Sequence, residues 1–506
     1  MANPKLFVFA VGGTGSRVLR SLTFLLAAGT HLGGFDLVPI IIDPDDQNGD
    51  MNRNLDCLKL YRKLKADLVG YSPKPGDFFE TNILAPDQTK DGLTGGFTDF
   101  RFNLHDVNNR KFSKYIGLDN GMSEANKALT QLLFSETDLA SDMNVGFKGR
   151  PHMGAVVLNQ IPDSQFFKDF AQSIDGHDRI FIISSIFGGT GSAGFPLLVK
   201  NIREASDGNV VYEKLQSVPI GALSVKPYFK LKDGNDKEIS SHAFMMKAKA
   251  ALYYYSKNLI QDGSINILYS IGDEGGEPYP NEVGGSNQKN RSHFVEFAGA
   301  LAVLDFAKLS ENESCLKTLS GKAQKPEVKE FGTKELGKNG INLQTLAEKS
   351  KGKFSKNLVS YFLFNLFLEK HLPESFDRTF AKTKKFRIDS AFVNSSFFQD
   401  LTTFNDYFKE WLGELKTNDV SFSPFSITWE NQNFSYVKNG LKNIIGKEDL
   451  KLRKIDNVKG FEVVVLDLLA DAHRKNKHFE NQYHYFIDVF NHVFKELTSK
   501  YSNLHS

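Results

Sequence analysis

The sequence predicts an α/β protein with a parallel sheet in its N-terminal part and a mostly helical, Phe-rich C-terminal domain. Apolar runs at residues 6–11 and 37–42 flank a helical pattern at 17–28, and strand, helix, strand in this order opens a parallel sheet. The alternation returns between residues 164 and 306. Beyond about residue 310, Lys-rich polar sequence gives way to Phe-rich helical patterns, which indicates a second domain.

Composition narrows the class of protein. The chain has 506 residues, 41% hydrophobic and 24% charged, which excludes a mainly disordered or fibrous protein. Its 62 Lys and Arg nearly balance its 60 Asp and Glu, so net charge gives no general attraction to nucleic acid or membrane. Cys57 and Cys315 are too few for a disulfide framework and indicate a reducing compartment. Without a signal-peptide pattern or an apolar run of about 18 residues, we expect a cytoplasmic protein with no membrane segment.

In the first third of the chain, each apolar run ends in residues suited to a ligand site. The run at 6–11 leads to Gly12-Gly13-Thr14-Gly15-Ser16, and the run at 37–42 leads to Asp43-Pro44-Asp45-Asp46. Residues 47–145 are rich in Gly, Asn, Asp and Lys, with one helical stretch near 123–133. We interpret them as a long insertion over one edge of the sheet.

The rest of the chain divides at about residue 310. A strand at 178–186 leads into a second glycine-rich turn at 187–194, and a strand at 217–225 ends at Lys226 and Pro227. Further along come a helix at 242–257, a strand at 265–271 and a long apolar helix from about 291 to 306. The predicted domains are therefore 1–310 and 311–506, the second helical except for one strand-like run at 461–466.

The most informative feature is a duplicated pentapeptide, Gly-Gly-Thr-Gly-Ser, at residues 12–16 and 188–192. Each copy follows an apolar strand and opens a helix. Glycine lets the backbone approach a ligand with no Cβ in the way, and a helix start offers unpaired N–H groups at the positive end of the dipole. Hydroxyl donors are added by Thr14, Ser16, Thr190 and Ser192. Two such turns predict a site for a di- or triphosphate between them.

Two common phosphate sites do not fit these turns. A single glycine-rich turn is equally explained as a tight strand-to-helix connection, but two identical turns in the same context favour phosphate binding. The dinucleotide pattern G-x-G-x-x-G fails because Ser16, Arg17 and Val18 follow Gly15. No Gly-Lys-Ser/Thr follows either turn, so the P-loop pattern fails as well. An ordinary Rossmann dehydrogenase or P-loop ATPase is therefore disfavoured.

The second turn, from Phe187 through Gly188-Gly-Thr-Gly-Ser192 to Pro196, resembles the signature loop of the tubulin/FtsZ superfamily. Other segments follow in that family's order. Residues 11–16 look like its first glycine loop, Asp43-Pro44-Asp45 like its second loop, and residues 146–154, with Gly149, like its third. Residues 223–229, around Lys226-Pro227, are similar to the FtsZ sequence Val-Thr-Lys-Pro-Phe. The resemblance covers residues 5 to 310.

The resemblance implies a GTP/GDP site with Mg²⁺, as in a divergent prokaryotic tubulin-like protein. The phosphates would be held by Gly12, Gly13, Thr14, Gly15 and Ser16 with Gly188, Gly189, Thr190, Gly191 and Ser192, and Gly149 would face the γ-phosphate. Asp43 or Asp45 would lie near the metal, since Mg²⁺ favours carboxylate oxygens. Lys226 and Pro227 would shape the ribose side, and Phe294 or Phe297 would stack on the base.

Three departures from the family pattern affect the expected recognition of the base and the expected hydrolysis of the nucleotide. Arg17 stands where FtsZ has an Asn that helps to read guanine, and the long helix lacks a Phe-x-x-x-Asn/Asp pair, which leaves Glu296 as a guess for the guanine edge. The FtsZ loop Asn-x-Asp-x-x-Asp, which activates water in the next subunit's site, has no clear counterpart. Only Glu311 and Glu313 are weak catalytic candidates there, and both are more simply solvated surface charges.

The main prediction is a GTP-binding protein that assembles head to tail into filaments or oligomers, with slow or assembly-dependent GTPase activity. The alternative is a nucleotide-binding switch or scaffold that does not polymerise and reaches a protein partner through its C-terminal domain. An enzyme that uses NAD or a phosphorylated metabolite is a third, weaker option. Guanine against adenine preference, hydrolysis and cellular role are left open by the sequence.

Overall fold

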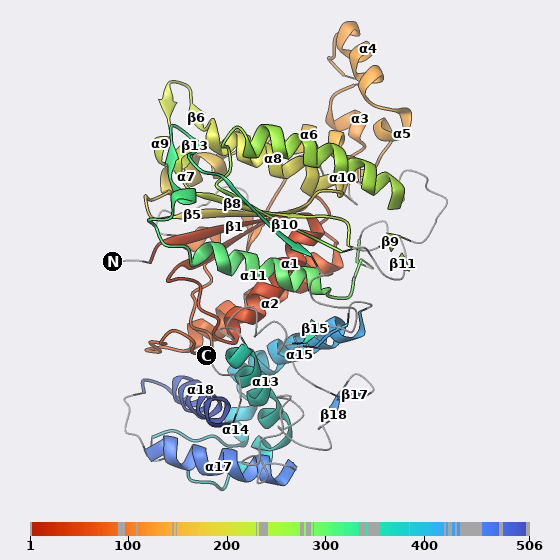
Figure 1. Cartoon of the computed structure of the whole chain (residues 1–506). Coiled ribbons are helices and arrows are strands. Elements are labelled where there is room, and N and C mark those ends of the chain that lie inside the picture. Colours follow the sequence, from red (N-terminus) through yellow and green to blue (C-terminus); the bar gives the residue numbers. More distant parts are fainter. Residues whose placement is uncertain are drawn as a thin grey trace.

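The structure is a computed structural model of the whole chain (Figure 1). It describes all residues except 1–2, 90–96, 108–109, 119, 144–145, 148, 229, 232–240, 274–277, 280–284, 287, 333–340, 343–354, 384, 419–420, 424–427, 431–432, 436–457, 475–478 and 502–506.

An eight-stranded sheet forms the centre of the N-terminal part, with strand order β14-β10-β8-β5-β1-β2-β4-β3. Seven strands are parallel, and β3 pairs antiparallel with β4 at one edge. The strands are β1 (Lys5–Val11), β2 (Asp36–Ile42), β3 (Phe97–Thr98), β4 (Arg101–Phe102), β5 (Arg179–Ser185), β8 (Ile220–Val225), β10 (Ile267–Gly272) and β14 (Glu327–Gly332). The continuous Val, Ile, Leu and Phe content of the central strands matches their burial on both faces.

Helices cover both faces of this sheet (Figure 1). One face carries α1 (Gly12–Ala27), α2 (Gly49–Asp67) and α11 (Phe294–Ala307). The other carries α6 (Pro151–Leu158), α7 (Gln165–Ser173), α8 (Gly189–Arg203) and α10 (Ser241–Tyr255). The predicted α/β class is therefore confirmed. Among the described residues no helix is both long and apolar enough to cross a membrane.

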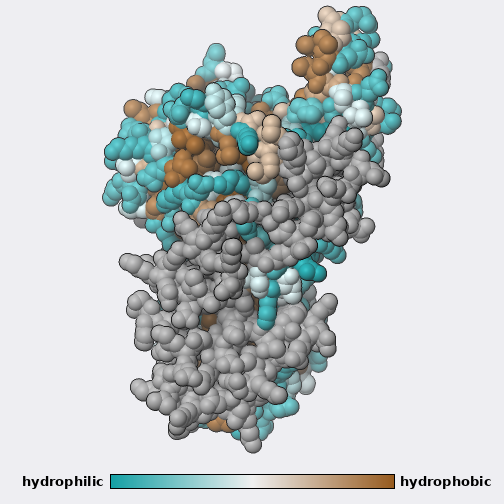
Figure 2. All heavy atoms as spheres, turned by 45° about the vertical axis from the view of Figure 1, so that its right-hand side comes forward, coloured by the Kyte–Doolittle hydropathy of each residue, from teal (hydrophilic) through white to brown (hydrophobic). Residues whose placement is uncertain are grey.

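Residues 47–145 contribute more to the core than the predicted insertion implies. Met51, Leu58 and Tyr61 bury one face of α2 against the sheet layer, and β4 extends the sheet. The part that stands apart is an arm at the top of Figure 1 with α3 (Phe112–Tyr115), α4 (Glu124–Leu133) and α5 (Glu136–Leu139). Leu129, Leu132 and Leu133 of α4 are exposed. Figure 2 shows apolar residues on the surface of this arm.

The C-terminal part is mostly helical, as predicted. Its helices are α13 (Ser355–Lys370), α14 (Ser390–Val393), α15 (Ser396–Thr417), α17 (Val458–Arg474) and α18 (Gln482–Tyr501). Phenylalanine rings form its core, for example Phe364 against Phe490 at 5.7 Å between centroids. The strand-like run at 461–466 lies within α17, so that prediction is wrong. Val465 and Leu469, both fully buried, repeat at helical spacing, and packing on α18 overrides the β-branched run.

Two observations adjust the predicted boundary between the parts. Strand β14 joins the sheet beyond residue 310 by pairing with β10. Helix α15 then packs back on α1 and α2, where Phe404 meets Phe24 at 5.4 Å and Tyr61 at 6.3 Å between ring centroids. The C-terminal helices thus share a core with the sheet's helical layer.

The remaining elements are short. They are η1 (Pro86–Gln88), β6 (Ser206–Asp207), β7 (Val210–Val211), α9 (Glu213–Ser217), β9 (Lys230–Leu231), η3 (Ser256–Ile260), β11 (Pro278–Tyr279), η4 (Ser314–Leu316), β12 (Thr318–Leu319), β13 (Lys322–Ala323), β15 (Ile341–Asn342), η6 (Leu372–Ser375), β16 (Phe422–Ser423), β17 (Thr428–Glu430) and β18 (Asn433–Ser435).

Candidate functional site

The two Gly-Gly-Thr-Gly-Ser turns lie next to each other. They follow β1 and β5, which pair in parallel with Ala10 opposite Ile183. A Cβ atom on Gly12 would lie 3.5 Å from the Cβ of Thr190 and 3.7 Å from the backbone nitrogen of Gly191. Because parallel strands end at one edge of a sheet, both helix starts point into the same region.

The glycines within each turn have different roles. Gly12 has φ of +74°, a backbone conformation that favours glycine. At the fourth position, a Cβ on Gly15 would come within 2.7 Å of the Ala10 carbonyl carbon, and one on Gly191 within 2.9 Å of Ser185 backbone atoms. Gly15 and Gly191 therefore permit close packing of each helix on the preceding strand. This packing role is independent of any ligand.

Two further predicted loops meet these turns. A Cβ on Gly189 would lie 3.1 Å from the backbone nitrogen of Gly149, so the third predicted loop contacts the second turn. A Cβ on Gly146 would lie 3.8 Å from Pro44, which places that loop beside the Asp43-Pro44-Asp45 segment. The Gly149 carbonyl accepts a 2.6 Å hydrogen bond from Lys247 on α10.

The starts of α1 and α8 lack the side-chain caps that α2, α7 and α15 have. Asn48, Ser164 and Ser395 cap α2, α7 and α15 through side-chain hydrogen bonds, whereas Val11 and Gly188 provide none. Neither α1 nor α8 has an acidic residue in its first turn. Their first N–H groups therefore keep the positive end of the helix dipole available to an anion.

The four predicted hydroxyl donors are not equivalent. Ser192 donates its hydroxyl to the Gly188 carbonyl one turn earlier. Ser16 is fully buried, and its Oγ has no hydrogen-bond partner among the described residues. Thr14 Oγ1 accepts a 3.4 Å bond from Arg17. The hydroxyl of Ser192 is thus committed within its own turn.

Asp43 and Asp45 form a buried acidic pair where β2 ends. Asp43 Oδ1 accepts from the Asp45 N–H at 3.1 Å, and Asp45 Oδ2 accepts from the Gly285 N–H at 2.7 Å. Loss of solvent raises the pKa of Asp43 to about 7, and the neighbouring Asp45 charge adds to that rise. Among the described residues no group of three or more His, Cys, Asp or Glu is arranged for a metal ion. Mg²⁺ would fit this carboxylate chemistry with phosphate and water as its other ligands.

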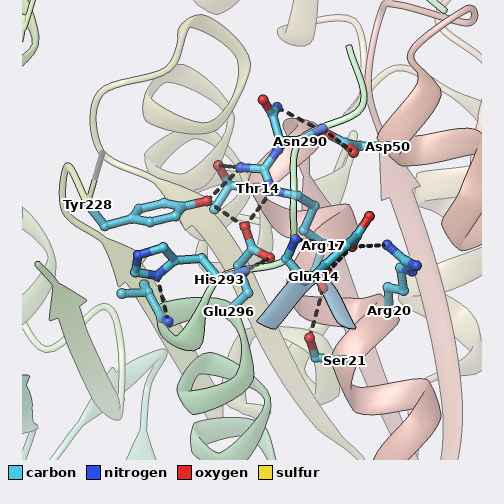
Figure 3. A network of polar contacts seen from close by, with 12 residues as sticks. Thr14, Arg17, Arg20, Ser21, Asp50, Tyr228, Asn290, His293, Glu296 and Glu414 are labelled. Atoms are coloured by element: carbon cyan, nitrogen blue, oxygen red, sulfur yellow. Dashed lines mark hydrogen bonds and ion pairs between the residues drawn. The ribbon is translucent and has the colours of Figure 1, made fainter. Parts of the chain in front are cut away.

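Arg17 lies at the centre of a buried polar network (Figure 3). Its Nε donates to Glu296 Oε1 at 2.6 Å, and its NH1 group donates to Asp50 Oδ2 at 3.0 Å. Its NH2 group donates to the Tyr228 hydroxyl at 2.6 Å and to Thr14 Oγ1 at 3.4 Å. Tyr228 in turn donates to Glu296 Oε1 at 2.7 Å. One guanidinium thus joins the first turn to α2, α11 and the segment after β8.

Burial sets the electrostatics of this network. Loss of solvent raises the pKa of Glu296, with Arg17 acting in the opposite direction. Burial also raises the pKa of Tyr228 well above its usual value. The phenol therefore stays protonated and donates a hydrogen bond to Glu296. Buried charges are tolerated only when they are paired and hydrogen-bonded, and here each charge meets an opposite one.

A second run of ion pairs continues from Asp50 to α15. Asp50 Oδ1 accepts from Arg53 NH2 at 2.7 Å, and Arg53 NH1 donates to Glu414 Oε1 at 2.6 Å. Glu414 Oε2 accepts from Arg20 NH1 at 3.1 Å and from the Ser292 hydroxyl at 2.8 Å. The first turn and the C-terminal helix therefore belong to one continuous polar network.

Glu296, expected at the guanine edge, is fully engaged within the chain. Its Oε1 accepts from Arg17 and Tyr228, and its Oε2 accepts from the His293 N–H at 3.1 Å. The last bond belongs to a capping box at the start of α11. Both oxygens thus have partners in the described chain.

The two phenylalanines expected at the base are core residues. Phe297 is fully buried, with its ring centroid 6.0 Å from that of Trp411 and 4.8 Å from that of Phe422. Phe294 also meets Phe422, at 5.2 Å. Contrary to the stacking prediction, both rings lie between α11 and the C-terminal part, because the helices pack there.

Lys226 and Pro227, expected at the ribose, lie one strand farther along the sheet. The Lys226 ammonium is paired with Glu330 of β14, and the backbone N–H of Lys226 donates to the Ile271 carbonyl at 2.7 Å. A Cβ on Gly272 would lie 2.7 Å from the Lys226 Cβ. These contacts direct Lys226 toward β10 and β14.

Glu311 and Glu313 lie at the opposite edge of the sheet. They follow the end of α11, and Glu311 pairs at 3.0 Å with His177, which precedes β5. The glycine turns follow the other ends of the strands. Neither glutamate can therefore reach the turns of its own chain.

Sequence reasoning missed several members of the buried network, namely Arg20, Asp50, Arg53, Tyr228, Asn290 and Glu414. Tyr228 stands two residues after Lys226 in a segment already singled out, and that position was the available signal. Asp50 and Glu414 are 364 positions apart by number, and no local pattern relates residues so far apart.

No protein-family profile and no curated protein matches the chain. Among solved structures it is similar to CetZ2 from Haloferax volcanii, described as a GTPγS-bound protofilament, at 14% identity and a TM-score of 0.29, covering 64% of each chain. It is also similar to CetZ1 from Haloferax volcanii, described as a GDP-bound monomer, at 15% identity and a TM-score of 0.27. That match covers 54% of this chain and 53% of CetZ1. Both matches span less than two thirds of the relative, and at these TM-scores neither fold nor function is inferred from them.

Proposed function

We propose that the chain is a tubulin/FtsZ-like protein that binds a nucleoside triphosphate with Mg²⁺ at the carboxyl edge of its sheet and assembles head to tail. The observation that carries this proposal is the convergence of the two glycine turns, with Gly12 beside Thr190. GTP is the nucleotide implied by the order of the sequence motifs.

In this proposal the uncapped ends of α1 and α8 hold the phosphates from two sides. Gly149 and the loop around it close the second turn. Mg²⁺ would be held by Asp43 or Asp45 and would neutralise the negative charge that phosphates bring to these carboxylates.

The phosphate assignment is tested with Gly188→Asp. Gly188 is the N-cap of α8 with φ of −78° and ψ of 162°, a conformation in which Asp caps helices well. The new carboxylate would bond the free N–H groups and repel an anion, while the Ser185 hydroxyl, 2.8 Å from the added Cβ, must rotate away. We expect loss of GTP binding at least tenfold, measured by calorimetry, while Gly176→Asp in an exposed loop serves as the control. Unchanged binding by Gly188→Asp would refute the assignment.

Head-to-tail assembly follows from where the acidic candidates lie. Glu311 and Glu313 are at the sheet edge opposite the turns, so only a second subunit stacked end to end would bring them to a nucleotide. Repeated contacts of this kind build an open filament when the rotation does not close.

Mixing two defective variants tests this arrangement. Gly188→Asp keeps the acidic segment, and a Glu311→Ala/Glu313→Ala chain keeps the turns. In a random equimolar filament, about one interface in four joins an intact turn to an intact acidic segment, so phosphate release should recover to about a quarter of wild type. Co-pelleting of the two variants without recovered phosphate release would contradict a role for these glutamates.

A non-polymerising switch is the second candidate, and the link from the first turn to α15 favours it. Glu414 and Arg17 belong to one network of ion pairs. In this candidate, a ligand bound at the first turn changes the position of the C-terminal helices through that network. Turnover measured across protein concentration separates the candidates. A polymerising GTPase rises steeply above a critical concentration, whereas a switch shows turnover that is simply proportional to protein.

A further inference from the structure

The predicted ligand residues fall into two groups with different surroundings. Those expected at the phosphates face one another across neighbouring strands, and the helix starts behind them have no side-chain caps. Those expected at the base and ribose, namely Arg17, Lys226, Glu296 and Phe297, are each engaged by other residues of the chain.

The two carboxylates bonded to Arg17 have too few acceptor sites left for the two donors of a guanine edge, namely one of four on Glu296 and none on Asp50. Glu296 accepts three hydrogen bonds, from Arg17, Tyr228 and His293. Asp50 accepts from Arg53 and from the Asn290 N–H at 3.1 Å on Oδ1, and from Arg17 and the Asn290 side chain on Oδ2. A guanine edge would have to displace Arg17 from one of them. That exchange would strip a buried guanidinium of a charged partner, which is strongly unfavourable.

Aromatic and cationic groups beside the network are committed in the same way. The Tyr228 ring lies 4.9 Å from the His293 ring and 6.4 Å from the Phe187 ring, between centroids. The Phe297 ring faces Phe422. Lys226 is directed away from the network, to Glu330 on the far side of β10, in an ion pair whose carboxylate is exposed. The α11 side thus offers a nucleoside neither an open ring face nor an unengaged carboxylate among these residues.

The charges of the network leave no positive excess. Its arginines are Arg17, Arg20 and Arg53, and its carboxylates are Asp50, Glu296, Glu410 and Glu414. The network therefore adds no net attraction for the ligand, which leaves the helix starts and a cation at Asp43 and Asp45 as the sources of affinity. All of these act on phosphate oxygens.

We propose that the described part of this site reads the polyphosphate group of its ligand and that the Arg17–Glu296 network does not read the base. The ligand class is a triphosphate with Mg²⁺, either free or carried by any nucleoside, whose base lies outside the Arg17–Glu296 network. This inference rests on the proposed function and specifies which part of the ligand is recognised. It makes Arg17 a positioning residue, which holds Thr14 in the first turn through its 3.4 Å contact.

The test compares three probes on the full chain by calorimetry in Mg²⁺: GTP, ATP and inorganic tripolyphosphate. The expected result is dissociation constants within threefold of one another. GTP binding more than tenfold tighter than both other probes overturns the inference and leaves the proposed function standing. Binding of none of the three overturns the proposed function itself.

Two variants examine the network directly. Glu296→Gln removes the charge that would read guanine, and Tyr228→Phe removes one hydroxyl without removing the ring. We expect each variant to change affinity for all three probes by the same factor, because each acts only through Arg17 and the first turn. A GTP-selective loss of tenfold or more in either variant would show that the base is read there and would overturn the inference. Circular dichroism spectra matching wild type establish that each variant is folded.

Discussion

Glu414 is the residue through which the C-terminal helix α15 is most firmly tied to the sheet layer, and Glu414→Gln tests that role. The carboxylate accepts four hydrogen bonds, from Arg20, from Arg53, and from the N–H and hydroxyl of Ser292. Its side chain is 14% exposed, and those of Arg20 and Arg53 are 2% and 9% exposed. A glutamine amide is neutral, so both arginines would lose a charged partner, and its NH2 group would face a donor.

The expected loss of unfolding free energy depends on the charged partners that Arg20 and Arg53 retain in the variant. Removing one partner of a buried ion pair costs about 3–5 kcal/mol. Arg20 keeps Glu410 at 3.1 Å and Arg53 keeps Asp50 at 2.7 Å, so the low end applies and we expect a loss of about 3 kcal/mol. With a urea slope of about 3 kcal/mol/M, the unfolding midpoint should fall by about 1 M.

Glu410→Gln is the matched control, because Glu410 bonds the same two arginines from a side chain that is 45% exposed. Exposed ion pairs contribute about 1 kcal/mol or less, so its midpoint should move by under about 0.3 M. Fluorescence of the fully buried Trp411, in a Trp429→Phe background, reports on α15. Equal shifts for the two variants would refute the reasoning that burial sets the strength of these pairs.

Three further predictions concern packing, acid and metal. Gly15→Ala and Gly191→Ala should each lower the free energy of unfolding by about 2 kcal/mol through contact with the preceding strand, against less than about 0.5 kcal/mol for Gly176→Ala, as measured by urea denaturation. Burial raises the pKa of Glu414 but Arg20 and Arg53 outweigh it and hold the pKa below the usual value of 4.5, so its stabilisation is present above about pH 4.5 and is lost as pH falls through the folded pKa. The difference in stability between wild type and Glu414→Gln should accordingly shrink between pH 6 and pH 3, and a constant difference would contradict the assignment. Removal of Mg²⁺ by a chelator should weaken tripolyphosphate binding at least tenfold in wild type and clearly less in Asp45→Asn, which calorimetry would reveal.

Local sequence patterns were sufficient for the strands β1, β2, β5, β8 and β10 and for the convergence of the glycine turns, but not for β3, β4 and β14. The glycine turns, the Asp43 segment and the loop at Gly149 each stand at the end of an apolar strand or the start of a helix, so their convergence follows from parallel strand order. Helix α2 was missed because Lys, Arg and Asp interrupt its buried stripe of Met51, Leu58 and Tyr61. Its apolar face is visible only once α1 is known to lie opposite.

The base side could not be predicted in the same way, because its residues are defined by contacts between distant segments. In the sequence, Arg17 is a polar residue that follows a turn, and Glu296 is a charged residue within an apolar helix. Their pairing at 2.6 Å depends on how α1 and α11 are placed on the sheet. Glu414 enters the same network from α15, which follows the sheet by many residues.

Identical pentapeptides therefore do not imply identical surroundings. Gly13 and Gly189 occupy the same place in the two turns, yet a Cβ on Gly13 would lie 3.7 Å from the Arg17 guanidinium, and one on Gly189 would lie 2.8 Å from the Phe147 Cβ. The first turn is bordered by charge and the second by the backbone of the loop at Gly149. An anion held between the two turns would lie near the Arg17 network on the side of the first turn. On the side of the second turn it would lie near main-chain N–H groups. Among the described residues, the first turn is joined to α15 by ion pairs that run through Arg17, Asp50 and Arg53 to Glu414, and we expect an effect of the ligand on the C-terminal helices to follow this route.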